Sequence, residues 1–122
     1  MSDTNEVTIV GEILSYLDIK PNITCDGKNL RFHIKTTETL YSDKTKSYIK
    51  HVEYHKVVVK DRDFRVHLAN QVESLLVPGN ILKIKGALRN YRYPNLKGVC
   101  SERSEVEAHT VELVRGFVNV NN

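Results

Sequence analysis

The order in which strand-like and helix-like stretches follow one another is the feature that most constrains the fold of this chain. Five stretches alternate polar and apolar residues or are rich in β-branched residues, as β-strands are. They occupy residues 5–19, 29–36, 51–60, 80–93 and 106–114. A single stretch, between the third and the fourth, repeats its apolar residues at helical spacing. This order is a specific pattern for a chain of 122 residues.

The second strand shows the alternation most clearly, in "NLRFHIKT" at residues 29–36. Apolar and basic residues take turns along it: Leu30, Phe32 and Ile34 on one side, Arg31, His33 and Lys35 on the other. Such a strand is half-buried and has a basic outer face. Before it, Asp26-Gly27 predicts a turn, and Gly11 in the first strand predicts a bend or a bulge.

The predicted helix lies within "DRDFRVHLANQVESLLVPG", residues 61–79. Apolar residues recur at every fourth position and form one stripe: Phe64, Leu68, Val72 and Leu76. Asp61 or Asp63 is suited to cap the first turn. Pro78 and Gly79 end the helix, because neither residue continues one well.

Two polar stretches separate the predicted elements. Residues 36–50, "TTETLYSDKTKSYIK", are rich in Thr, Ser and Lys with aromatic insertions, and they predict a long loop or a protruding hairpin. Residues 94–105, "PNLKGVCSERSE", predict a second long loop. Gly86, in the strand that precedes this loop, predicts a further bend.

These elements predict an all-β fold, a five-stranded oligonucleotide-binding (OB) barrel with one α-helix between strands 3 and 4. A chain of 122 residues has the size of a single domain. We place that domain at residues 1–115 and a short C-terminal tail at residues 116–122. The middle strands and loops of such barrels hold single strands.

The net charge of the chain is only +3, but the charge is unevenly placed. From Lys28 to Lys97 there are 15 Lys and Arg against 6 Asp and Glu, whereas the two ends together hold 3 against 9. This asymmetry predicts that the middle of the chain contacts a polyanion. A solvated basic face without a partner is the alternative, and charge alone does not separate the two.

The sequence does not support a membrane protein, a secreted protein, a metalloprotein or an enzyme. No apolar run approaches the roughly 20 residues of a membrane span, and the N-terminus lacks the pattern of a secretory signal. Cys25 and Cys100 form no disulfide framework, which favours reduced thiols in an intracellular protein. On a strand, His51 and His55 are about 13 Å apart, too far for one metal ion. No catalytic pair, triad or phosphate loop is recognisable, so we predict no enzyme, metal or cofactor.

Four segments, in order, resemble the motifs of one family. "NEVTIVGEI" resembles an opening Asn-x-Val-x-Leu-x-Gly-x-Leu, and "GKNLRFHIKTTE" resembles a second strand that ends in Ala-Thr-x-Glu. "EYHKVVV" is similar to Glu-Trp-His-Arg-Val-x-x, with Tyr54 in place of the Trp. "VPGNILKIKGALRNYRY" is similar to a segment that ends in Gly-x-Leu-Arg-x-x-x-Trp, with Tyr93 at the final Trp. The family is that of the bacterial-type single-stranded DNA-binding proteins, and the resemblance runs from about Asn5 to Val114.

Some features depart from the family pattern. The chain has no Trp, Leu40 occupies an aromatic place beside Tyr41, and Lys60 stands where the family often has Phe. The family's glycine-rich tail with an acidic tip, which recruits replication proteins, is absent from a sequence that stops at Asn122. A relative without that tail would be an organellar, phage or plasmid form, or a dimeric barrel of the primosomal replication protein N type.

A protein that binds single strands without reading sequence needs flat rings for the bases and cations for the phosphates. On an alternating strand, Tyr54 shares a face with Val52 and Lys56, which favours stacking over a place in the core. The predicted DNA-binding residues combine such rings and cations: Tyr41, Tyr48, Tyr54, Tyr91, Tyr93, Arg31, Lys35, Lys50, Lys56, Arg89 and Arg92.

The resemblance implies a protein that binds single-stranded DNA without strong sequence preference and protects it during replication, recombination or repair. It also implies a homo-oligomer that pairs through the first strand, a tetramer in preference to a dimer, with replication proteins as further partners. The closest alternative is a dimeric primosome-type accessory factor that binds single-stranded DNA and replication proteins. A barrel that binds only proteins and one that binds RNA are further alternatives. The expected location is the bacterial cytoplasm, with the mitochondrial matrix or a phage or plasmid origin as alternatives.

Overall fold

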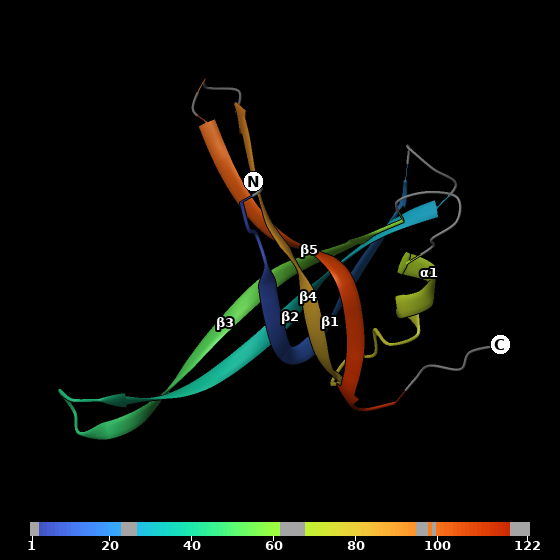
Figure 1. Ribbon diagram of the computed structural model, residues 1–122. Helices are drawn as coiled ribbons and strands as arrows, with labels where there is room; N and C mark the ends of the chain where they lie inside the picture. The colour runs from blue at the N-terminus through green and yellow to red at the C-terminus, as the bar shows by residue number, and fades with distance from the viewer. Residues whose placement is uncertain (1–2, 23–26, 62–67, 95–97, 99, 118–122) are drawn as a thin grey trace.

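The computed structural model describes residues 3–22, 27–61, 68–94, 98 and 100–117. In this part of the chain, five strands surround a single core and a short helix lies beside them (Figure 1). The elements in chain order are β1 (Val7–Asn22), β2 (Gly27–Ser42), β3 (Ser47–Lys60), α1 (Leu68–Glu73), β4 (Ile81–Pro94) and β5 (Cys100–Arg115). No helix among these residues is long and apolar enough to cross a membrane.

The strands form a closed barrel in the order β1-β2-β3-β5-β4, with β4 pairing back onto β1. All neighbouring strands are antiparallel except β3 and β5, which run parallel and are paired at Val57 with Val106 and Val58 with Glu107. The pairing of β4 with β1 joins all five strands into one barrel. The predicted all-β barrel is therefore confirmed.

The helix between β3 and β4 ends earlier than the predicted one. It covers six residues and packs against β2 and β3. It ends at Glu73 because the next turn tightens, with hydrogen bonds from Leu75 N–H to Val72 O (2.9 Å) and from Leu76 N–H to Glu73 O (3.1 Å). These three-residue bonds belong to a 3₁₀ turn. Leu76, the last residue of the predicted stripe, therefore lies beyond the helix, and Phe64 lies outside the described residues.

Asp61 links the helix to the barrel. Its buried carboxylate accepts hydrogen bonds from the backbone N–H of Ala69, in the first turn of α1, and of Lys28, in β2, both at 2.8 Å. A carboxylate that accepts an N–H of the first turn satisfies a group that the helix leaves free. Asp61 thus binds an N–H of the helix from eight residues away, and not from the adjacent cap position that the sequence predicted, whereas Asp63 lies outside the described residues.

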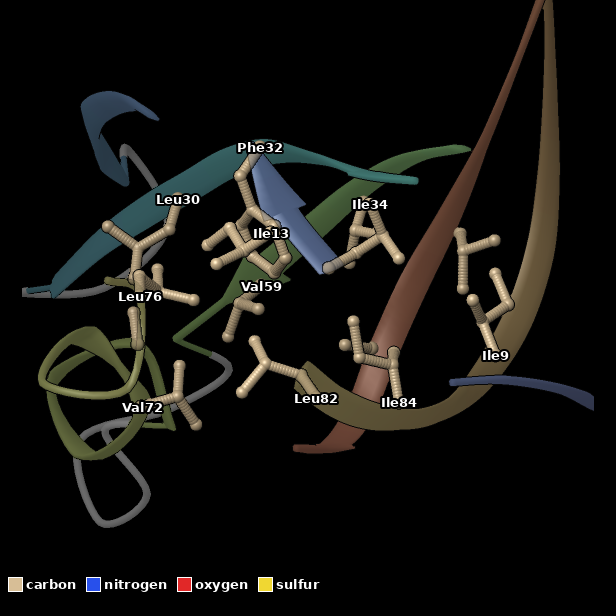
Figure 2. Packing of buried hydrophobic residues seen from close by; sticks show 14 residues of the cluster. Ile9, Ile13, Leu30, Phe32, Ile34, Val59, Val72, Leu76, Leu82 and Ile84 are labelled. Carbon is tan, nitrogen blue, oxygen red and sulfur yellow. The ribbon is translucent and has the colours of Figure 1, made fainter. Parts of the chain in front are cut away.

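The core is built from the apolar residues of the alternating strands. Figure 2 shows their side chains converging inside the barrel, with those of α1 over one end. The buried cluster comprises Ile9, Ile13, Leu30, Phe32, Ile34, Val57, Val59, Ala69, Val72, Leu76, Leu82, Ile84, Val106 and Ala108. The inward residues predicted for the second strand all belong to it.

Two glycines allow strands to approach closely. At Gly86 the register of β4 and β5 shifts, and a Cβ there would collide with the carbonyl of Glu107. The irregularity is a bulge whose extra residue, His109, belongs to β5 and not to the strand for which we predicted a bend. At Gly11 a Cβ would lie 2.5 Å from the carbonyl oxygen of Lys35. The irregularity that we predicted at Gly11 falls later in β1, between Ile13 and Leu17.

Two hairpins extend far beyond the barrel as arms (Figure 1). The β2–β3 arm continues an unbroken ladder out to Ser42 and Ser47, so the protruding hairpin, and not the loop, is the correct alternative for residues 36–50. The β4–β5 arm pairs Pro94 with Cys100, so the loop predicted over residues 94–105 was wrong for residues 100–105. Residues 102–104 are exposed, and a strand with no buried face carries no apolar alternation to reveal it.

Candidate nucleic-acid interface

One face of the β2–β3 arm gathers most of the predicted DNA-binding residues. In an antiparallel ladder, two residues directly opposite each other project to the same side of the sheet. Every second residue along one strand also projects to that side. We call this side the front face. Its opposed pairs are Arg31 with Val58, His33 with Lys56, Lys35 with Tyr54, Thr37 with Val52, Thr39 with Lys50, and Tyr41 with Tyr48.

The three tyrosines of the front face lie open to solvent. Tyr54 is 62% exposed, Tyr48 73% and Tyr41 55%. Tyr41 and Tyr48 contact each other edge to face near the tip, with ring centroids 5.3 Å apart and an interplanar angle of 65°. The core position considered for Tyr54 is therefore wrong. An exposed ring on a rigid strand offers an unpaired base a surface for stacking.

The lysines of the front face have no carboxylate partner within the residues that the structure describes. Lys35 and Lys56 flank Tyr54, the first across the ladder and the second along β3, and Lys50 lies closer to the tip. Among the described residues, no ion pair involves any of these three lysines. Their charges remain available to an anion, and cations that neutralise phosphates supply the main attraction to a nucleic acid.

The opposite side of the arm, which we call the back face, carries acidic and histidine side chains. Glu53 lies between two histidines, with its oxygens 2.8 Å from His51 Nε2 and 3.8 Å from His55 Nε2. His55 Nε2 also lies 2.9 Å from Thr36 Oγ1. The hydrogen bond from His51, together with the charge of that ring, lowers the pKa of Glu53 below its ordinary value of 4.5. The arm thus separates cations on its front from carboxylates on its back.

The outer surface of the barrel between the two arms is covered by ion pairs. Arg31 Nε lies 3.4 Å from Glu105 Oε2, and Arg89 Nε lies 3.4 Å from Glu107 Oε1. Lys60 Nζ lies 3.9 Å from the same oxygen of Glu107. These carboxylates are buried, so the predicted cations Arg31 and Arg89 balance charges that the fold itself has desolvated.

The β4–β5 arm carries its predicted residues differently. The guanidinium of Arg103 lies over the ring of Tyr91, 5.7 Å from its centroid. Arg92 forms an ion pair with Glu102 (2.9 Å), and alternation along β4 places it on the side opposite Tyr91. By the same alternation Arg89 shares the side of Tyr91, so Arg92 is the member of the predicted groove that lies on the other face. The side chain of Tyr93 lies outside the described part of the chain.

Sequence reasoning missed one residue of the front face and the acidic partners beside it. His33 lies half-buried between Arg31 and Lys35 and opposite Lys56. The alternation of the second strand already placed it there. Glu105 and Glu107 gave no such signal, because they lie in a stretch that the sequence predicted as loop or closing strand.

Three solved structures with the same architecture are single-stranded DNA-binding proteins. A Plasmodium falciparum SSB, solved in complex with ssDNA, superposes with a TM-score of 0.75 at 17% identity, covering 93% of this chain and 95% of that one. The chain has the fold of this class of protein. It also matches the Thermus aquaticus protein (a deletion mutant; TM-score 0.75, 16% identity, 93% of this chain and 51% of that one). A small Streptomyces coelicolor single-stranded DNA-binding protein gives a TM-score of 0.63 at 15% identity, over 88% and 92% of the two chains.

No protein-family model and no curated protein sequence matches the chain. The resemblance drawn from the four sequence segments is nevertheless confirmed at the level of the fold, by the barrel and by its structural neighbours.

Proposed function

We propose that this protein binds single-stranded DNA along the front face of the β2–β3 arm. The observation that carries this proposal is the row of exposed tyrosines set among lysines that have no acidic partner in the described part of the chain. Tyr54, Tyr48 and Tyr41 would stack on bases, each at about 1–3 kcal/mol. Phosphates would be bound by the lysines of the same face, Lys35, Lys50 and Lys56.

Such a face binds DNA without strong sequence preference, because every base presents a flat π surface to a ring. Long-range attraction comes from the lysines and weakens as salt rises. The protein would act as a binding protein and not as an enzyme, holding unpaired DNA extended and protected during replication, recombination or repair. The architecture that it shares with single-stranded DNA-binding proteins supports this role.

We further propose that the protein assembles as a homo-oligomer through β1. The β1–β4 ladder covers Val7–Glu12, whereas the β1–β2 ladder begins only at Glu12. Within the described chain, Val7–Val10 therefore has one edge without a neighbouring strand, and Val10 is half exposed beside it. A two-fold axis at such an edge would join the β1 strands of two copies. Mass measurement in solution would distinguish a monomer from a dimer or a tetramer.

The experiment that tests DNA binding is a fluorescence titration with oligo-dT at low and high salt. We expect quenching of tyrosine emission at low salt, because stacked bases quench phenol rings, and weaker binding at high salt. A barrel that binds only proteins would show unchanged fluorescence at both salt concentrations, and this result would refute the proposal. Competition between poly-dT and poly-U then separates a DNA preference from an RNA preference.

A further inference from the structure

Two arginine–glutamate pairs lie side by side on the barrel surface between the arms. Arg31 reaches from β2 across β3 to Glu105 of β5, and Arg89 reaches from β4 to Glu107 of β5, each at 3.4 Å. Val58 lies between Arg31 and Glu107 in the ladder and is fully buried, although it projects out of the barrel. Arg31 and Glu107 are thus the ladder neighbours of a buried apolar residue.

The carboxylate of Glu105 depends on its arginine. Its side chain is entirely buried, and Oε1 has no hydrogen-bond partner among the described residues. A buried carboxylate that loses its cation is left as an uncompensated charge, which strongly destabilises the fold. Arg31 is therefore not free to leave Glu105 and follow a phosphate, as a solvated lysine would be.

Both arginines nevertheless keep hydrogen-bonding capacity. In each pair the contacting atom is Nε, and the side chains are 26% (Arg31) and 42% (Arg89) exposed. A guanidinium has five N–H donors in a fixed fork, and only one of them belongs to Nε. The donors on the terminal nitrogens remain able to bind two oxygens of one phosphate at once.

We propose that Glu105 and Glu107 are positioning residues, which hold Arg31 and Arg89 in place for bidentate contacts to DNA phosphates and cancel their charge. The arginines then strengthen binding by short-range hydrogen bonds without adding to its salt dependence, which the lysines of the front face set. This inference rests on the proposed binding of single-stranded DNA and adds a second kind of phosphate contact to it.

The test is the affinity for oligo-dT measured over a series of salt concentrations. The key variant replaces both partners, Arg31→Gln with Glu105→Gln, and so leaves the net charge unchanged. We expect weaker binding with an unchanged slope of log K against log[salt]. Glu105→Gln alone should steepen the slope by about 0.7, because one cation is released. Lys50→Ala is the control, and should reduce the slope by about 0.7.

Arg31→Lys provides a second readout of geometry. Lysine keeps the charge but lacks the planar fork, so we expect several-fold weaker binding with the wild-type slope. The inference is overturned if the double variant loses as much slope as Lys50→Ala, or if it binds as tightly as the wild type. Circular dichroism checks folding, and Arg31→Lys, which leaves Glu105 a cationic partner, carries the test alone should the Glu105 variants unfold. A wild-type protein that binds no oligo-dT would instead refute the proposed function itself.

Discussion

The two arms of the molecule share a shape and differ in how their charged and aromatic groups are used. Both are long antiparallel ladders that leave the barrel in different directions (Figure 1). On the β2–β3 arm, Tyr54 and Tyr48 are open and Lys50 has no acidic partner among the described residues. On the β4–β5 arm, Arg92 is paired with Glu102 and the ring of Tyr91 lies under Arg103.

This difference shows why the number of basic and aromatic residues is a poor measure of an interface. A cation that already balances a carboxylate adds little long-range attraction for a polyanion, since the pair has no net charge. A ring with a guanidinium on one face offers a base only its other face. We therefore expect the β2–β3 arm to supply most of the affinity and the salt dependence.

The largest expected effect is that of Tyr54→Ala. Loss of one stacking surface should weaken binding to oligo-dT by about 1–3 kcal/mol, or roughly 5-fold to 150-fold. The ring lies on the surface, so the variant should stay folded. Fluorescence anisotropy with a labelled oligonucleotide measures the loss directly.

Tyr54→Phe is the matched control for this substitution. It keeps the ring and removes the hydroxyl, so an affinity close to that of the wild type is expected if stacking is the main contribution. Equal, large losses in both variants would mean that the hydroxyl, and not the ring, makes the contact.

The next effect concerns the lysines of the same arm. The double variant Lys50→Ala, Lys56→Ala should make the slope of log K against log[salt] shallower by about 0.7 for each phosphate released. The measurement is a series of titrations over a range of salt concentrations. An unchanged slope would mean that these lysines do not contact the phosphates. The β2–β3 arm would then not be the source of the salt dependence.

Smaller effects are expected on the β4–β5 arm. Arg92→Ala breaks only an exposed ion pair on the face away from Tyr91, and should change the affinity less than about 2-fold. Tyr91→Ala should cost less than Tyr54→Ala. If Tyr91→Ala proves as harmful as Tyr54→Ala, the two arms contribute equally and Arg103 does not restrict the ring.

The sequence predicted the barrel well because each central strand has one buried face. Leu30, Phe32 and Ile34 reveal that face by alternation, and the helix reveals its position by the stripe through Val72. The start of β5 could not be predicted, because residues 102–104 are exposed and carry no apolar alternation.

The sequence predicted the candidate site correctly for residues of the same strand, because alternation alone shows which of them share a face. Tyr54 and Lys56 were placed together correctly, since two positions along a strand suffice to relate them. The pairing of Arg31 with Glu105 joins residues 74 positions apart in the chain. No local pattern shows that β5 brings a buried carboxylate next to that arginine, so its charge was counted as free.

The smallest predicted effect separates the two faces of the β2–β3 arm itself. His51 lowers the pKa of Glu53 below its ordinary 4.5, so the folded protein holds this proton less tightly than the unfolded chain. The resulting stabilisation is present above the unfolded pKa and is lost as pH falls through the folded pKa. An NMR titration of the Glu53 carboxyl should give a midpoint below 4.5, and His51→Gln should raise it. The same variant should leave the affinity for oligo-dT at neutral pH unchanged, because His51 lies on the back face; a marked loss would show that DNA contacts both faces of the arm.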